Sequence, residues 1–311
     1  MKLKIKQNSI FFKILLIILI IILIIIIYNL INNEKFIDYQ DFEIIYSYTC
    51  HENKEVFIDT LRNLFYFNKN QKIGIIVNCN MAMFESLKDL DTSAEFKNVI
   101  INPNPFDKVK FTYDIIEGHL QNFRHCLNNN IRAKYFILLA SNCMFHKDIT
   151  MDIIEQYMND DNIDITKNFQ ILQNNEHKWH WSTLLQNKKI ITILNDANIS
   201  NDYIIGCQHE GLILPFDIME AILTFIDSHS IKQNIEKQTV FEEILLPTIY
   251  RNIIGNAPTN CCHVFWDKPN NIPTIDEIKV CVKPNIKQVV RNINDPIRTW
   301  LRSSNNNYVI A

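Results

Sequence analysis

The sequence predicts an α/β protein with a mostly parallel sheet and helices on both of its faces, joined to an N-terminal membrane helix. Apolar runs alternate with segments of helical spacing, and each apolar run ends in polar residues, which predicts the α/β part. An unbroken apolar stretch near the N-terminus predicts the membrane helix. No internal repeat or long linker divides the remainder, and its roughly 280 residues suffice for one large domain.

The N-terminal stretch Ile14–Ile27 consists only of Ile and Leu. Extended to residues 10–31, it is interrupted by Lys13, Tyr28 and Asn29 alone, and about 20 largely apolar residues span a bilayer as a helix. A cleaved signal peptide is the alternative, but it would have a shorter apolar region followed by small residues such as Ala-x-Ala. The chain continues with Asn-Asn-Glu, so we expect a retained signal anchor.

The charges that flank this stretch predict its orientation. Four lysines lie before or at the start of the stretch, namely Lys2, Lys4, Lys6 and Lys13, whereas the other flank carries Glu34, Lys35 and Asp38. The positive-inside rule then places the N-terminus in the cytosol and the bulk of the chain on the luminal side of a Golgi- or ER-type membrane. We therefore expect a single-pass type II protein with a cytosolic tail at residues 1–9, a span at 10–31, a short stem at 32–41 and one luminal domain at 42–311.

The luminal side is oxidising, so some of the cysteines are expected to pair, with the connectivity left open. None shows the C-x-x-C spacing of a zinc site. Asn198-Ile-Ser is the N-glycosylation sequon of the chain and would lie on the luminal side.

Composition and motifs exclude several function classes. The net charge is −3, with both signs scattered along the chain, whereas a nucleic-acid-binding protein would carry a basic stripe. The chain has no G-x-G-x-x-G, Walker A loop, G-x-S-x-G elbow or H-E-x-x-H. Dehydrogenase, nucleotide-hydrolase, serine-hydrolase and zincin readings therefore lose their main support.

The expected elements of the first half follow in order. Strands are expected over residues 43–48, 72–77, 99–101 and 135–140, and helices over 56–67 and 113–128. Parallel sheets bind ligands at the carboxyl ends of their strands. The polar residues at those ends are therefore candidate ligand contacts: His51, Asn78, Ser141 and Asn142.

Two helices are expected in the second half. Residues 216–226 form an amphipathic pattern whose start carries Pro215 and Asp217, both typical of a first turn. Residues 239–252 form another, interrupted by Pro247. Beyond residue 256 the chain is expected to be rich in loops.

Five segments, taken in order, match the motifs of one known family: Ile44-Ile-Tyr-Ser-Tyr-Thr-Cys-His51, Ile73-Gly-Ile-Ile-Val-Asn-Cys-Asn80, Lys134-Tyr-Phe-Ile-Leu-Leu-Ala-Ser-Asn142, Gly206-Cys-Gln208 and Glu242-Glu-Ile-Leu-Leu-Pro-Thr248. With these segments the chain resembles the core-2/I-branching β-1,6-N-acetylglucosaminyltransferase and peptide-O-xylosyltransferase family. The resemblance covers roughly residues 42 to 300, and its motifs are individually short. Two departures concern Asn142-Cys143, where the family has Gly and a polar residue, and His209-Glu210, where it has tryptophans.

The resemblance implies a GT-A-type nucleotide-sugar fold and an inverting transfer of GlcNAc or xylose from a UDP-sugar to a glycan or protein hydroxyl. The family's catalytic base falls on Glu243, with Glu242 next in line, because one carboxylate has to take the proton of the attacking hydroxyl. The donor-binding candidates are His51, Asn78, Ser141, Asn142 and Gln208, with Lys283 and Arg291 opposite the diphosphate. The acceptor-binding candidates are Trp179, Trp181, Trp266 and Glu210.

No metal is expected. A metal-dependent transferase usually carries Asp-x-Asp after an apolar strand, but Ser141-Asn142-Cys143 stands there, and the literal match Asp89-Leu-Asp91 follows a helical stretch. Without a metal, basic side chains have to neutralise the diphosphate. Candidates cluster late in the chain: Lys279, Lys283, Lys287, Arg291 and Arg298.

Two other readings stay open. One is a metal-dependent glycosyltransferase of another family, and the other is a non-catalytic, membrane-anchored carbohydrate-binding protein. The expected partners are a nucleotide-sugar donor, a glycan or glycoprotein acceptor and the lipid bilayer through residues 10–31. No cofactor and no nucleic acid are expected.

Overall fold

The computed structural model describes residues 40–51, 53–69, 71–90, 93–108, 112–159, 169–171, 188–200, 204–234, 242–265, 272–287 and 289–308. The expected tail, membrane span at 10–31 and nearly all of the stem lie outside these residues. In the part that is described, no helix has the length and apolar character needed to cross a bilayer. Everything described after Gln40 belongs to one compact unit, Asp41–Ala311.

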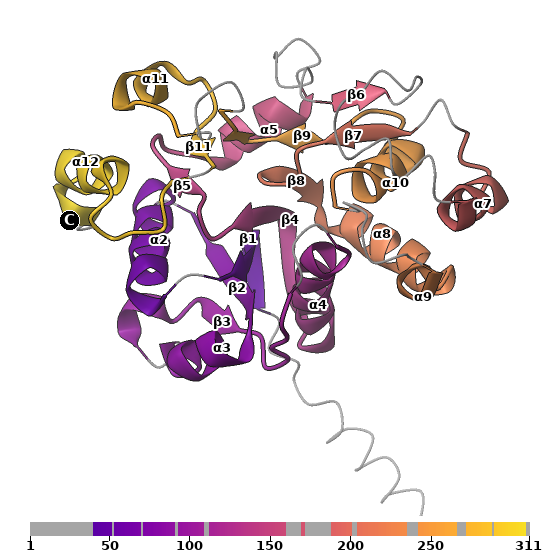
Figure 1. Ribbon diagram of the computed structural model, residues 1–311, viewed down its shortest axis with the longest axis horizontal. Helices are drawn as coiled ribbons and strands as arrows, with labels where there is room; N and C mark the ends of the chain where they lie inside the picture. The colour runs from indigo at the N-terminus through magenta and orange to yellow at the C-terminus, as the bar shows by residue number, and fades with distance from the viewer. Residues whose placement is uncertain are drawn as a thin grey trace, which may run out of the picture. The chain divides into compact units, whose positions relative to one another are not determined.

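A six-stranded sheet with the order β3-β2-β1-β4-β8-β9 forms the centre of this unit (Figure 1). The first three strands in chain order, β1, β2 and β3, run parallel. The strand β8 is antiparallel to β4, and β9 is antiparallel to β8. The mostly parallel α/β sheet predicted from the sequence is confirmed, and the antiparallel β8 and β9 make it a mixed sheet, which the sequence did not predict. The strands are β1 (Gln40–Cys50), β2 (Ile73–Cys79), β3 (Val99–Ile101), β4 (Ile131–Ala140), β8 (Leu212–Pro215) and β9 (Thr259–Asn260).

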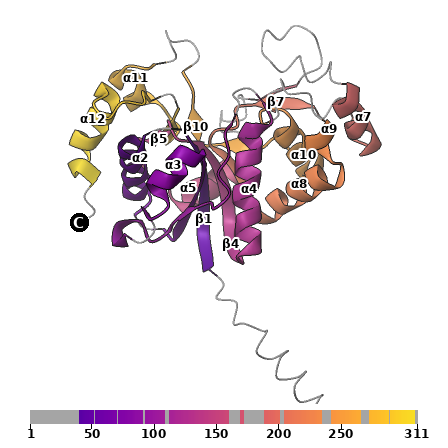
Figure 2. The same cartoon turned by 60° about the horizontal axis from the view of Figure 1, so that its bottom comes forward.

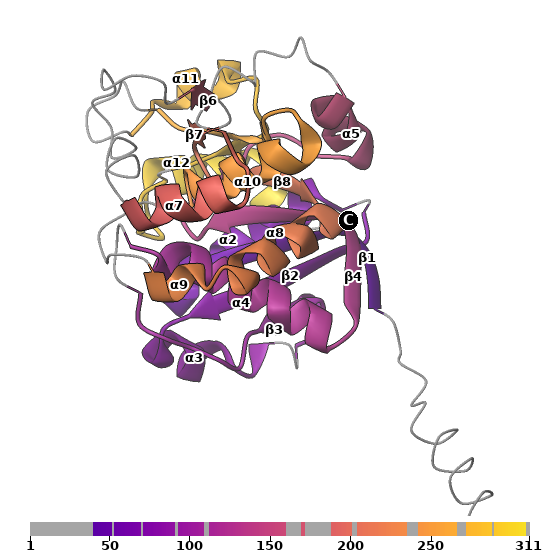
Figure 3. The ribbon, with the colours of Figure 1, turned by 90° about the vertical axis from the view of Figure 1, so that its right-hand side faces the viewer.

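Helices cover both faces of the sheet, as expected. The helices α2 (Lys54–Phe67) and α3 (Met81–Leu87) pack on one face, in a core with Ile44 and Tyr46 of β1. The helices α4 (Asp114–Asn128) and α8 (Phe216–Ser228) pack on the other face, around Ile45. Figures 2 and 3 show these two layers. Alternate side chains of a strand point to opposite faces, so a strand buried on both sides reads as the continuous apolar runs of the sequence.

Polar residues after the first two strands begin the helices that follow. The side chain of Asn53 accepts from Val56 N at 2.9 Å, and that of Asn80 accepts from Met83 N at 2.9 Å. Each asparagine therefore satisfies one unpaired amide of the first helical turn, which stabilises the helix by about 1 kcal/mol. These caps place α2 and α3 directly after the strand ends.

The helix expected over 239–252 begins later than predicted. Residues 239–241 lie outside the described part, Glu242–Ile244 form a turn, and α10 spans Leu245–Ile254. Pro247 falls in the first turn of α10, where a missing amide hydrogen costs nothing, so it does not interrupt the helix. Gly255, at φ 91°, ends α10 in the left-handed conformation that glycine adopts without strain.

Two smaller sheets and further short helices complete the unit. Strands β10, β11 and β5 form a small sheet, and β6 pairs antiparallel with β7. The bounds are β5 (Met144–Phe145), β6 (Phe169–Ile171), β7 (Ile205–Cys207), β10 (Cys262–His263), β11 (Asn285–Ile286), α5 (Met151–Asn159), α7 (Lys188–Asp196), α9 (Ile231–Asn234), α11 (Ile275–Val280), α12 (Pro296–Ser304), η2 (Ala94–Phe96) and η6 (Asn306–Tyr308).

All eight cysteines are buried free thiols, so the expectation that some pair is not met in this structure. Burial raises the pKa of Cys79 to about 11 and that of Cys126 to about 12, which keeps both thiols protonated near neutral pH. Asn198 of the sequon is exposed, in a turn after α7 at φ 58°. This exposure is what an N-glycosylation acceptor requires, and its modification stays a prediction.

Candidate active site

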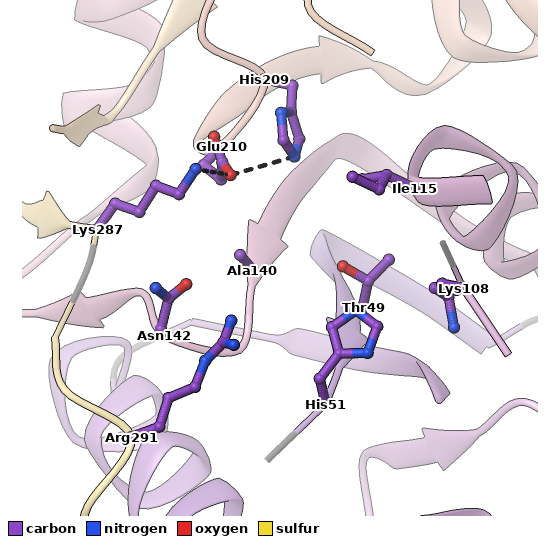
Figure 4. Close-up of a pocket in the computed structure, with 10 residues that line it drawn as sticks. All are labelled: Thr49, His51, Lys108, Ile115, Ala140, Asn142, His209, Glu210, Lys287 and Arg291. Atoms are coloured by element: carbon purple, nitrogen blue, oxygen red, sulfur yellow. Dashed lines mark ion pairs between the residues drawn. The ribbon is translucent and has the colours of Figure 1, made fainter. Parts of the chain in front are cut away.

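A cavity of about 440 Å³ opens at the carboxyl ends of β1 and β4 (Figure 4). Ligand sites of open α/β sheets lie at this edge, because the loops that follow parallel strands converge there. The cavity is large enough for a nucleotide-sized ligand, since small-molecule sites typically enclose about 300 to 1,000 Å³. Its lining residues are Thr49, His51, Lys108, Ile115, Ala140, Asn142, His209, Glu210, Lys287 and Arg291.

The strand ends bring together two of the four polar residues expected there. His51 follows β1 and Asn142 follows β4, and both line the cavity. Asn78 at the end of β2 is fully buried instead, and its Nδ2 donates to Asn104 O at 3.2 Å. Ser141 is also fully buried and does not line the cavity. The cavity thus lies at the edge of the sheet where the sequence predicts ligand contacts, but Asn78 and Ser141 are buried and not part of its lining.

A tight turn before β8 presents His209 and Glu210 to the cavity. Gly211 has φ +80°, and its N donates to Leu138 O of β4 at 2.6 Å. A Cβ on Gly211 would lie 2.5 Å from the Cβ and N of Cys262, so only glycine fits. Asn260 Nδ2 donates to Gln208 O at 2.9 Å and to Glu210 O at 2.5 Å. Gln208 thus supports the turn through its backbone, and its side chain is not part of the cavity lining.

Glu210 is the centre of a buried charge cluster. Its Oε1 lies 3.3 Å from His209 Nε2 and forms an ion pair with the Lys287 ammonium group (Figure 4). On the other side of the imidazole ring, His209 Nδ1 lies 3.9 Å from Glu243 Oε1. The side chains of His209, Glu210 and Glu243 are at most 7% exposed, so these charges interact with little screening by water.

Glu242 and Glu243 lie in the turn that directly precedes α10, beside β7. Cys207 N donates to Glu243 O at 2.8 Å, and the Thr248 hydroxyl exchanges hydrogen bonds with the backbone of Ile205. The threonine noted in the sequence motif thus fixes this turn against β7. Both glutamates are buried, and Glu243 contacts His209 without lining the cavity itself. His209 therefore lies between Glu243 and the cavity.

The cluster favours the charged forms of its basic members. Burial lowers the pKa of His209, but Glu210, Glu243 and Glu242 outweigh burial and raise it above its ordinary value. For Lys287, Glu210 likewise outweighs the lowering by burial, and its pKa is raised. His119, whose ring centroid lies 6.2 Å from that of His209, behaves oppositely: burial, His209 and Lys108 lower its pKa, so it stays neutral.

Glu242 is expected to make stability depend on pH. Burial raises its pKa to about 7 from an ordinary 4.5, against the lowering by His209. The folded protein therefore holds the proton more tightly, and stability is lost as pH rises through this window. The Glu242→Gln variant stays neutral and avoids this loss. Its free energy of unfolding, relative to that of the wild type, should therefore be up to about 3 kcal/mol higher near pH 8 than below pH 4.5. Urea unfolding at both pH values measures this, and a pH-independent difference would refute the assignment.

The late basic residues separate into different roles. Lys287 and Arg291 line the cavity, from the loop after β11, whose Val289 N donates to Asn142 O at 3.2 Å. Lys283, predicted opposite the diphosphate, is instead buried, with its Nζ 3.2 Å from Cys262 O. Lys279 is on the surface, paired with Asp276. Arg298 is fully buried and paired with Asp59, away from the cavity lining.

Several other predicted residues are not brought to the cavity. Trp179, Trp181 and Trp266 lie outside the described residues, as does Asp91. Asp89 is exposed after the end of α3 and does not line the cavity. Conversely, Thr49, Lys108, Ile115 and Ala140 line it without having been singled out. Thr49 and Ala140 adjoin the strand ends, which is the signal that could have found them, whereas Lys108 belongs to no motif.

His209, Glu210 and Glu243 could in principle hold a metal ion. One potential ligand atom from each lies within 4.8 Å of the others. However, Glu210 is already bound to the Lys287 ammonium group, and a divalent ion beside this ammonium would be repelled by it. These three side chains therefore fit a site in which a lysine supplies the positive charge better than they fit a metal centre.

Comparisons with known proteins give little beyond the fold. No family model matches the chain, and no curated protein matches its sequence. Among solved structures, the crystal structure of an active-site mutant of LgtC is similar, with a TM-score of 0.42 and 7% identity over 84% of this chain and 95% of that one. A similarity of this size carries no argument about activity, so the function has to be inferred from the site.

Proposed function

We propose that this protein is a glycosyltransferase that moves GlcNAc or xylose from a UDP-sugar to a hydroxyl of a glycan or protein, with inversion and without a metal. One observation carries the proposal: the cavity at the strand ends is lined by Lys108, Lys287 and Arg291, with Glu210 as the one carboxylate among the described lining residues. This excess of positive charge suits a nucleotide diphosphate, which is the leaving group of such a transfer.

Lys287 and Arg291 are the proposed diphosphate ligands. Both come from the loop after β11 and line the cavity beside Asn142 (Figure 4). Glu210 holds the ammonium group of Lys287 in place, which reduces the reorganisation needed when negative charge develops on the departing UDP. Lys287 thus replaces Lys283 in the role that the sequence suggested, and Arg291 keeps its role.

Glu243 is the proposed base. The acceptor oxygen attacks the anomeric carbon, the bond from this carbon to the diphosphate oxygen breaks, and UDP leaves with the electron pair. The relay runs in the fraction of the protein in which His209 is neutral and carries its proton on Nδ1. The acceptor hydroxyl then gives its proton to His209 Nε2, and the Nδ1 proton passes to the Glu243 carboxylate 3.9 Å away. Glu210 is bound to two cationic groups, so we assign it to positioning them rather than to proton transfer.

The wider setting is part of the same proposal. Residues 10–31 anchor the protein in a Golgi- or ER-type membrane with the catalytic domain on the luminal side, as the apolar run and the flanking charges suggest. The acceptor is then a glycan or glycoprotein of that compartment, and Trp179, Trp181 and Trp266 are the proposed stacking residues for its sugar rings.

The test is UDP release by the purified full-length protein across a panel of UDP-sugars, with candidate acceptors, with and without EDTA. We expect turnover with one donor that survives EDTA. Turnover that EDTA abolishes and Mn²⁺ restores would contradict the metal-free mechanism and point to the His209, Glu210 and Glu243 cluster as a metal site. Binding of a donor or glycan without turnover for any acceptor would favour a carbohydrate-binding protein instead.

A further inference from the structure

Lys108 contributes to the positive charge of the cavity, but it belongs to no sequence motif and the proposed mechanism gives it no individual role. It lies in the segment between β3 and α4 and lines the cavity with Thr49 and His51. Figure 4 shows it on the opposite side of the cavity from Lys287 and Arg291. A ligand that reaches from one side to the other would therefore meet positive charge at both ends.

The ammonium group of Lys108 is buried and lacks a hydrogen-bonded counter-charge among the described residues. Its Nζ has no hydrogen-bond partner among the described residues and lies 4.4 Å from the centroid of the Phe106 ring. Burial lowers the pKa of Lys108 to about 8, although nearby cysteines and aspartates partly oppose this shift. A buried cation without a hydrogen-bonded counter-charge is unfavourable, and an anion that binds beside it removes that cost.

Gly118 in α4 leaves the space that the Lys108 side chain occupies. A Cβ at this position would lie 2.7 Å from Lys108 Cε and 2.9 Å from Thr49 Cγ2. Glycine weakens a helix interior relative to alanine, and the chain has only five glycines, so one inside α4 calls for a packing reason. The close approach of the lysine stem and of β1 supplies that reason.

We propose that Lys108 binds a phosphate oxygen of the nucleotide-sugar donor from the β1 side, while Lys287 and Arg291 hold the diphosphate from the other side. The identity of the ligand rests on the proposed function. The physical basis, an unpaired ammonium group held in a cavity by the shape of α4, does not depend on sugar transfer. Gly118 acts on the ligand through Lys108 and is a positioning residue.

Proton uptake on anion binding is one way to test this role of Lys108. A bound anion raises the pKa of a neighbouring ammonium group. Binding near pH 8.5, where Lys108 is partly neutral, should therefore take up protons from the buffer, and this uptake should disappear without Lys108. A purely structural lysine would show no such change. The groups that face it are Cys50, Cys79, Asp107, Asp114 and His119.

The experiment is calorimetric titration of full-length protein with UDP and, separately, with inorganic diphosphate. Lys108→Met keeps an unbranched side chain but removes the ammonium group, and we expect UDP affinity to fall at least about tenfold with loss of proton uptake. Gly118→Ala, an independent variant, should also weaken UDP binding because it displaces the lysine. Lys279→Met, on the surface and distant from the cavity lining, should bind as the wild type does. Circular dichroism confirms that each variant is folded.

The two probes separate failure of this inference from failure of the proposed function. UDP affinity of folded Lys108→Met within twofold of wild type would overturn the inference and leave the transferase proposal intact. If the wild type does not bind UDP but binds inorganic diphosphate more tightly than Lys108→Met does, the anion site stands and the nucleotide donor is wrong. If the wild type binds neither probe, both proposals fail.

Discussion

Replacing Glu243 with glutamine is expected to lower kcat for sugar transfer by at least about 100-fold and to leave UDP affinity within about twofold of the wild type. Glutamine keeps the size of the side chain beside His209 Nδ1, which lies 3.9 Å from the carboxylate, but it cannot accept a proton. A residue that acts only as a base is needed in the transition state and not for binding, so kcat should change while the dissociation constant does not. UDP release and calorimetric titration measure the two quantities.

Two matched substitutions make this result interpretable. Glu220→Gln alters an exposed glutamate of α8 whose partner is Arg132, and it should leave kcat unchanged. Glu210→Gln should weaken UDP binding, because it releases the Lys287 ammonium group that Glu210 holds. If Glu210→Gln instead abolishes turnover at unchanged UDP affinity while Glu243→Gln keeps most of its activity, Glu210 is the base and the assignment has to be reversed.

Asp59→Asn is expected to destabilise the protein by about 3 to 5 kcal/mol, the largest effect on stability that the structure suggests. Asp59 Oδ2 accepts from Arg298 Nη1 at 2.9 Å, and Asp59 Oδ1 accepts from Arg302 Nη1 at 3.0 Å. Arg298 is fully buried, so removing the carboxylate charge leaves a guanidinium group in the interior without its counter-charge. The pair ties α12 to α2, across most of the length of the chain. Urea unfolding gives the free energy.

Asp276→Asn is the control for the loss of an acidic partner. Asp276 is 90% exposed and pairs with Lys279 on the surface, so its replacement should cost less than about 1 kcal/mol. A cost for Asp59→Asn as small as that of the control would show that Arg298 finds other partners, such as Val290 O and the Thr60 hydroxyl, that suffice.

The sequence predicted the bounds of the central strands β1, β2 and β4 more accurately than the start of helix α10. The strands expected over 43–48, 72–77 and 135–140 lie within or overlap β1, β2 and β4, because buried strands read as apolar runs that end in polar residues. The helix expected from residue 239 begins only at Leu245. The apolar pattern continues through Ile244, but a proline in the first turn and the packing of Glu242 and Glu243 against His209 and β7 set the true start.

Local patterns in the sequence determined the α/β class and the strand ends beside which the cavity lies, and the family resemblance singled out the two glutamates that are buried near His209. Only the tertiary structure decided which cations face the cavity. Lys283, Lys287 and Arg298 are alike in sequence terms, yet they are respectively buried against backbone, paired with Glu210 at the cavity, and paired with Asp59 in the core. The physical reason is that the role of a charge depends on its partner and its burial, and these partners lie up to 239 residues away in the chain, where no periodicity or spacing can indicate them.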